Sequence, residues 1–139
     1  MKEWQELRSK ALEYYGRRCM CCGNTHKSIH VDHIYAKSHY DTLSRNFKNL
    51  QILCETCNLS KSNTWYKDYR IEENNLKLYS IEKQREITIM SKQVKFQKDC
   101  IDHLRLLKEN YKSRSGRLTK KNKARVRKEQ KLFRMAYQD

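Results

Sequence analysis

The chain has 139 residues, of which 37% are apolar, so it is long enough for one modest core and one appended element, and two full domains are not expected. It carries 31 Lys and Arg against 16 Asp and Glu, a formal charge of +15. A charge of this size indicates a polyanionic partner, either a nucleic acid or an anionic membrane surface.

Neither a membrane span nor a signal peptide is predicted. No run approaches the roughly 20 apolar residues that a spanning helix needs, and the start, MKEWQELRSK, lacks the apolar stretch of a signal peptide. We therefore expect a cytoplasmic protein. In a reducing cytoplasm the six cysteines are not expected to form disulfides, so clustered thiols indicate metal binding or chemistry.

The first half of the chain predicts a helix, a hairpin and a second helix. Apolar residues recur at helical spacing over residues 4–15 and Gly16 can end the pattern, which predicts an amphipathic helix that covers the next element. Residues 28–35 and 49–53 are short and β-prone, and the polar segment between them predicts a hairpin with a long connection. A helix is then expected to begin near Cys57.

The second half is predicted to be helical. Apolar residues on an a/d heptad series predict a long helix over about residues 80–111. The series is short, which favours ordinary packing within the chain, and a homodimer or a partner protein bound through the 80–111 helix is the alternative. Residues 113–116 offer a break, after which Thr119 can cap a last helix.

The last segment is strongly basic. Residues 112–139 hold eleven Lys or Arg against two acids, which is more than solubility needs. We interpret this segment as a surface that contacts phosphates, and the alternative is a solvated face without a ligand. The candidate contacts are Lys120, Lys121 and Arg125.

Two C-x-x-C pairs predict a tetrahedral Zn²⁺ site, because each pair presents two thiolates to one metal. The pairs are separated by 31 residues, so the metal would staple the ends of a folded insertion that contains both strands. Cys21 could also be a metal ligand. Because Gly23 directly follows Cys22, however, Cys19 and Cys22 are favoured as the first ligand pair. The predicted ligands are Cys19, Cys22, Cys54 and Cys57.

The stretch YGRRCMCCG…VDHI…NLQILCETCNLSK resembles the HNH endonuclease family in its zinc-stapled form, over about residues 4–65. The family's fold is a ββα unit that holds a catalytic divalent metal, and its activity is hydrolysis of phosphodiester bonds in DNA. The resemblance implies an α+β fold with a zinc-stapled ββα-metal nuclease domain over residues 1–66, which begins with a helix. A mainly α-helical, basic extension would follow over residues 67–139.

The resemblance also assigns roles to four residues. It implies that His33 is the general base, that Asp32 and Asn58 hold the catalytic metal, and that Asn49 is the orienting amide. Asn58 stands where the family's name has His. The chemistry is consistent, because a neutral imidazole can accept a proton from water, and carboxylate and amide oxygens suit Mg²⁺ or Mn²⁺. Candidate phosphate contacts near this site are Lys61, Arg45 and Lys48.

The predicted strand conflicts with a shared site for Asp32 and His33, which are adjacent in the sequence. Adjacent side chains of a regular strand point to opposite faces, so Asp32 and His33 cannot both line one site in the middle of a strand. Either the strand ends there or it bulges. We therefore predict irregular or strongly twisted backbone near residues 32–34.

Two groups of residues are predicted to lie outside this site. Cys21 and Cys100 are expected to be unligated, buried thiols. Trp65, Tyr66 and Tyr69 follow the active-site helix and are expected to pack between the two parts of the chain, with nucleobase stacking as the alternative.

Together these patterns predict a metal-dependent HNH endonuclease, bacterial or phage-encoded, that nicks or cuts double-stranded DNA with structural Zn²⁺ and catalytic Mg²⁺ or Mn²⁺. One alternative is a catalytically inactive, zinc-stabilised DNA-binding module, which would not need Asp32, His33 and Asn58 together. A nuclease subunit that is active only in a larger assembly is the other.

Overall fold

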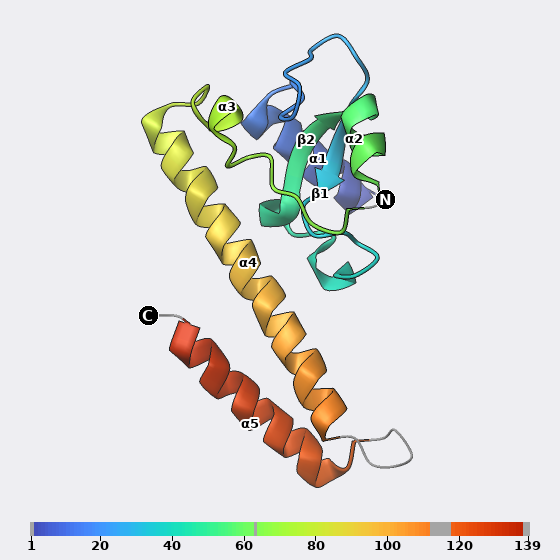
Figure 1. Cartoon of the computed structure of the whole chain (residues 1–139), viewed down its shortest axis with the longest axis vertical. Coiled ribbons are helices and arrows are strands. Elements are labelled where there is room, and N and C mark those ends of the chain that lie inside the picture. Colours follow the sequence, from blue (N-terminus) through green and yellow to red (C-terminus); the bar gives the residue numbers. More distant parts are fainter. Residues whose placement is uncertain (1, 63, 112–117, 138–139) are drawn as a thin grey trace. The chain divides into compact units, whose positions relative to one another are not determined.

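The computed structural model describes residues 2–62, 64–111 and 118–137 (Figure 1). Its elements, in chain order, are α1 (Lys2–Tyr15), β1 (Ile29–His33), η1 (Asp41–Leu43), η2 (Phe47–Asn49), β2 (Leu50–Cys54), α2 (Glu55–Lys61), α3 (Glu73–Leu76), α4 (Ile81–Asn110) and α5 (Lys120–Tyr137). The chain divides into two compact units, Met1–Val94 and Lys95–Asp139, with the division inside α4. The domain boundary predicted after residue 66 stays a prediction.

A two-stranded antiparallel hairpin is the centre of the first unit. Its register runs from Ile29 opposite Cys54 to His33 opposite Leu50, and α2 follows β2 directly. The predicted strands are confirmed to within two residues, and so is the helix expected near Cys57. The α+β class and the ββα order of the predicted domain are therefore confirmed.

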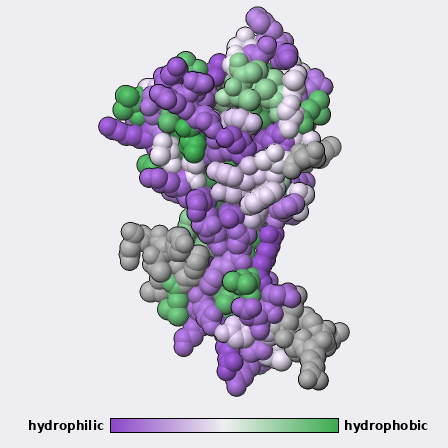
Figure 2. All heavy atoms as spheres, in the orientation of Figure 1, coloured by the Kyte–Doolittle hydropathy of each residue, from purple (hydrophilic) through white to green (hydrophobic). Residues whose placement is uncertain are grey.

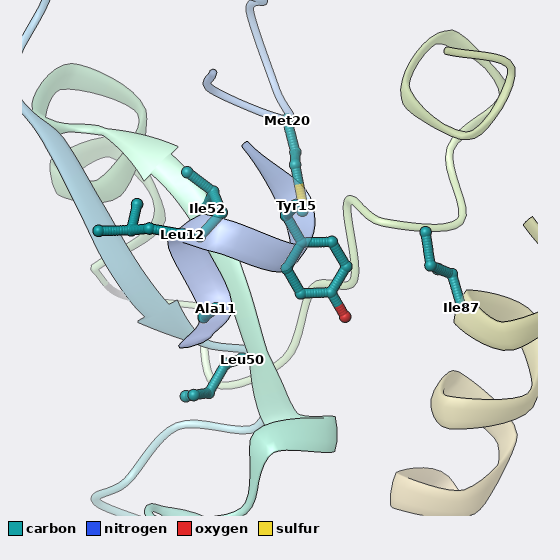
Figure 3. Packing of buried hydrophobic residues seen from close by; sticks show 7 residues of the cluster. All are labelled: Ala11, Leu12, Tyr15, Met20, Leu50, Ile52 and Ile87. Atoms are coloured by element: carbon teal, nitrogen blue, oxygen red, sulfur yellow. The ribbon is translucent and has the colours of Figure 1, made fainter. Parts of the chain in front are cut away.

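The hairpin is covered on both faces, because every residue of β2 is buried. Leu50 and Ile52 face α1, as the two-residue period of a strand requires, and Gln51 and Leu53 face the opposite side. Figure 3 shows the cluster that fills the first side, which draws on α1, β2, α4 and the segment after α1: Ala11, Leu12, Tyr15, Met20, Leu50, Ile52 and Ile87.

The predicted helix ends are largely confirmed. Gly16 ends α1 with a φ of +90°, and its N–H donates to the carbonyl of Leu12 at 2.8 Å. Thr119 caps α5, since its hydroxyl accepts from the N–H of Asn122 at 3.1 Å. The predicted break at residues 113–116 lies outside the described residues.

In the second unit, α5 packs against the last turns of α4. Leu107 and Val126 are buried there, and the Tyr111 hydroxyl donates to Glu129 at 2.7 Å. The surface of this unit is mainly hydrophilic in the view of Figure 2, apart from its uncoloured residues. A dimer or partner bound through α4 stays a prediction.

A buried ion pair joins the segment after α2 to two helices of the first unit. The side chains of Arg70 and Asp68 are 0% and 1% exposed and meet at 3.0 Å. Arg70 also donates to the Tyr15 hydroxyl at 3.2 Å, and the Ser91 hydroxyl donates to Asp68 at 2.8 Å. This network connects residues 68–70 with α1 and with the first half of α4.

We expect Asp68→Ala to lower the free energy of unfolding by about 3–5 kcal/mol, because it leaves the Arg70 charge buried without its partner. Urea denaturation of the purified protein measures this change. Glu72→Ala is the matched control, since it breaks an ion pair with Lys67 whose side chains are 49% and 43% exposed. The control should cost less than about 1 kcal/mol, and equal losses would contradict the prediction.

Candidate active site and metal centre

Four thiols meet at the open end of the hairpin, where Ile29 pairs with Cys54. The sulfur atoms of the two C-x-x-C pairs all lie within 4.8 Å of one another: Cys19, Cys22, Cys54 and Cys57. The Cys22 and Cys54 sulfurs are 3.7 Å apart. A tetrahedron with Zn–S bonds of about 2.3 Å has edges of about 3.8 Å, so the cluster is compatible with structural zinc.

The backbone prepares these sulfurs to be metal ligands. The N–H of Cys22 points to the sulfur of Cys19 at 3.5 Å, and the N–H of Cys57 points to that of Cys54 at 3.4 Å. Burial acts to raise the pKa of Cys19, but backbone N–H donors lower it to about 7. In Cys57, burial and the neighbouring thiols raise the pKa. A cation between the sulfurs would favour the thiolates that zinc requires.

The two remaining cysteines differ from each other. Cys100 is buried, as predicted, whereas Cys21 is exposed, so its predicted burial is wrong. Cys21 lies in the tight turn between Cys19 and Cys22, where the two flanking sulfurs point inward to the cluster. Of the two residues between these ligands, Met20 is buried and Cys21 is exposed.

Asp32 is held on the face of the hairpin that meets α2. Its Oδ2 accepts from Nε2 of Gln51 at 3.0 Å and lies 3.1 Å from the ammonium of Lys61. Gln51 is itself fixed, because it also donates to the carbonyl of Lys67 and accepts from the N–H of Tyr69, both at 2.8 Å. The carboxylate therefore has a defined orientation.

Lys61 is part of this arrangement. Its side chain is only 5% exposed, and its ammonium also donates to the backbone carbonyl of His33 at 2.9 Å. One ammonium thus balances the Asp32 charge and holds the end of β1. The predicted contact of Lys61 with a DNA phosphate stays a prediction.

His33 is held on the other face of the hairpin. Its ring stacks on the indole of Trp4 in α1, with centroids 5.3 Å apart and planes at 20°. Its Nε2 lies 2.7 Å from the carbonyl oxygen of Ser44. A carbonyl only accepts, so Nε2 carries the hydrogen, and the neutral ring then has its lone pair on Nδ1.

Asn49 fixes the backbone around His33. Its Oδ1 accepts from the N–H of Tyr35 at 2.8 Å, and its Nδ2 donates to the carbonyls of Tyr35 and Leu43 at 3.1 and 3.2 Å. Because this amide is fully buried, it connects the chain after β1 with the loop that precedes Ser44. The catalytic role predicted for Asn49 stays a prediction.

The pairing of β1 with β2 is regular up to His33, so the side chains of Asp32 and His33 point to opposite faces of the hairpin. The bulge that the sequence allowed at this position is therefore wrong. The strand instead ends at His33, and the backbone bends at Ile34. At this end both residues line one cavity of about 130 Å³, together with Asn58 and Lys61. A second cavity, of about 290 Å³, is lined by Trp4, His33, Lys37, Ser44 and Arg45.

The other candidate phosphate contacts are distributed over both units. Arg45 lines the second cavity and pairs with Glu3 at 2.6 Å, and Lys48 lies half-buried in η2. The candidates in α5 are all exposed: Lys120, Lys121 and Arg125. Their contact with DNA stays a prediction.

Sequence reasoning missed three groups that position the site. Gln51 stands inside the N-L-Q motif, where a polar residue in a buried strand could have drawn attention. The helix that contains Trp4 was expected to cover the next element of the chain. The helical spacing of its apolar residues does not indicate that Trp4 contacts His33. Ser44 acts through its carbonyl, for which the sequence has no signal.

These elements define a small ββα domain with a four-cysteine cluster and a polar cavity at the end of its first strand. Residues 19–64 match the model of the HNH endonuclease family, which confirms the resemblance and identifies an HNH domain over about a third of the chain. No curated protein matches the chain, and no solved structure does. Among the described helices, none has the length and apolar character needed to cross a membrane.

Loss of the zinc is expected to unfold the hairpin, because a structural metal supplies much of the folding free energy of a small domain. Cys57→Ser, or chelation of the wild-type chain, should remove the metal found by elemental analysis and lower the thermal unfolding temperature. Cys21→Ser is the matched control, since this exposed thiol lies between two ligands and should change neither value. An unchanged circular dichroism spectrum after chelation would contradict the prediction.

Proposed function

We propose that this chain is a metal-dependent endonuclease that hydrolyses phosphodiester bonds in double-stranded DNA. The observation that carries the proposal is the cavity at the end of β1, which brings Asp32, His33 and Asn58 together. A zinc-stabilised module that only binds DNA has no need of this combination. The proposal thus favours an enzyme over the inactive alternative.

In this proposal His33 is the general base. A neutral imidazole with a free Nδ1 can accept a proton from a water molecule that attacks the phosphorus. The contacts of Trp4 and of the Ser44 carbonyl keep the ring in one orientation and one tautomer. Asn49 holds the backbone on both sides of this contact, which makes it a positioning residue.

Asp32 and Asn58 would hold the catalytic Mg²⁺ or Mn²⁺. A carboxylate and an amide oxygen are hard ligands that suit either ion, and both residues line the cavity. The bound cation would supply positive charge for the phosphorane and for the leaving 3′ oxygen. Gln51 keeps the Asp32 carboxylate oriented, and the Lys61 ammonium adds a second positive charge beside the cavity.

DNA would be held by charge. The formal charge of +15 and the exposed basic residues of α5 favour contacts with the phosphate backbone, which carry no sequence information. Arg45 and Lys48 would add contacts close to the cavity. We propose a cytoplasmic protein of bacterial or phage origin for this activity.

His33→Ala should slow the nicking of supercoiled plasmid in Mg²⁺ or Mn²⁺ by about 100- to 10,000-fold, the usual contribution of a general base. Binding of the same plasmid, followed by gel shift, should persist. His26→Ala is the matched control because this histidine is exposed and lies outside the cavity. Wild-type rates in His33→Ala would rule out the proposed base.

Removing three positive charges from α5 should flatten the salt dependence of DNA binding. Each lost phosphate contact is expected to lower the slope of log K against log salt by about 0.9. The variant replaces Lys120, Lys121 and Arg125 by Gln, and fluorescence anisotropy with labelled duplex measures the slope.

The matched control for this experiment removes the same charge elsewhere. It replaces three exposed lysines of other elements by Gln: Lys2, Lys77 and Lys95. Its slope should stay close to that of the wild type. Equal slopes for the two triple variants would refute a specific role of α5 in binding.

A further inference from the structure

Two large aromatic side chains are exposed just after α2. Trp65 is 47% exposed and Tyr66 is 38% exposed, so neither is fully buried, and their predicted packing between the two parts of the chain stays a prediction. Tyr69, by contrast, is partly buried against the core, as expected. Together with exposed His39, these two residues form a patch that we call the aromatic surface.

The residues of the aromatic surface are held by contacts with their neighbours. Tyr66 stacks on the buried ring of Tyr35 at 4.5 Å and 29°, and the Trp65 carbonyl accepts from the N–H of Ala36 at 2.8 Å. The indole of Trp65 is nearly parallel to the ring of His39, with planes at 10° and centroids 6.1 Å apart. Rings that are already fixed lose little conformational entropy when a ligand stacks on them.

This surface adjoins the cavity of the proposed active site. Ala36 and Thr64 line the cavity with Asp32 and His33, and Thr64 directly precedes Trp65. A strand whose phosphate enters the cavity would therefore pass beside Trp65.

The charge around the aromatic surface favours a nucleic acid over an apolar peptide. The connection that carries His39, residues 36–48, holds three Lys or Arg against one Asp. One of these, Lys37, lines both cavities beside His33. Exposed aromatic rings next to a positively charged groove are the combination that binds single-stranded nucleic acid, because bases stack while phosphates are neutralised.

We propose that the exposed ring of Trp65 stacks an unpaired base of the DNA next to the scissile phosphate, and that Tyr66, whose ring is tilted by 50° to the indole, borders this base. In a continuous duplex both faces of a base are covered by its neighbours, so only a base outside the duplex stack can present a face to these rings. The preferred substrate is then a junction of double- and single-stranded DNA. This inference rests on the proposed nuclease function and names the substrate of the same site.

The test measures binding by the full chain carrying His33→Ala, in which cleavage is expected to be slow compared with the binding measurement. The probes are a labelled blunt duplex, the same duplex with a single-stranded DNA tail, and the duplex with an RNA tail. Trp65→Ala should weaken binding of the DNA-tailed duplex by roughly 5- to 100-fold, the usual effect of losing a stacked base. Its affinity for the blunt duplex should not change.

Two control variants separate stacking from other effects of the substitution. Trp65→Phe keeps an aromatic face and should retain most of the affinity for the tailed duplex. Leu59→Ala removes another exposed apolar side chain, from α2, and should change no affinity. Equal losses in Trp65→Ala for blunt and tailed DNA would overturn the proposal, and so would an equal loss in Trp65→Phe.

Fluorescence gives a second readout. The chain has two tryptophans, so Trp4→Phe leaves Trp65 as the sole indole, and DNA with a tail should quench it more than blunt DNA does. Absence of quenching would overturn the proposal. A loss of binding confined to the RNA tail would overturn its assignment to DNA, and no loss with any probe would leave the surface to a protein partner.

The outcomes for the two proposals are distinguishable. If the wild-type chain cuts plasmid but Trp65→Ala binds every probe normally, the aromatic surface has another role and the nuclease stands. If the wild-type chain cuts nothing while Trp65→Ala loses the tailed duplex selectively, the stacking stands and the nuclease fails.

Discussion

The closure of the hairpin by four thiols is the interaction on which the candidate site depends. One pair precedes β1, and the other begins at the last residue of β2 and enters α2. A single metal between them would tie the start of α2 to the segment that enters β1, at the end of the hairpin where Ile29 pairs with Cys54. Asn58 and Lys61 follow within the next turns of this short helix, so their positions beside Asp32 depend on the direction that the cluster gives to it.

The alternation of side chains in β1 divides the site between two layers. Asp32 faces α2, and Gln51 of β2 and Lys61 of α2 hold it there, whereas His33 faces α1, where Trp4 holds it. Both residues nevertheless line the cavity at the end of β1, where the strand ends at His33. The family match begins at residue 19, yet α1 supplies the surface that orients the proposed base. The functional unit of the first half is therefore larger than the matched domain.

Patterns in the sequence were sufficient for the parts of the fold that local chemistry determines. The spacing of thiols predicted the cluster, and the β-prone runs and Thr119 predicted the strands and the start of α5. The contacts that complete the site could not be predicted, since Trp4 and the Ser44 carbonyl reach His33 only through tertiary packing. The exposure of Trp65 could not be predicted for a related reason, because composition does not show which face of a loop is covered.

The charge balance at the end of β1 has a consequence for the proposed reaction. The Asp32 carboxylate already has the Lys61 ammonium at 3.1 Å, so the pair is neutral before any divalent cation binds. A cation held by one such carboxylate and one neutral amide would be bound weakly, since like charges repel strongly in a partly buried site. Phosphate oxygens are the ligands that Mg²⁺ commonly adds to one or two carboxylates. In the proposed nuclease, binding of the cation and binding of DNA would therefore reinforce each other, because the scissile phosphate supplies the negative charge that the protein's own residues do not.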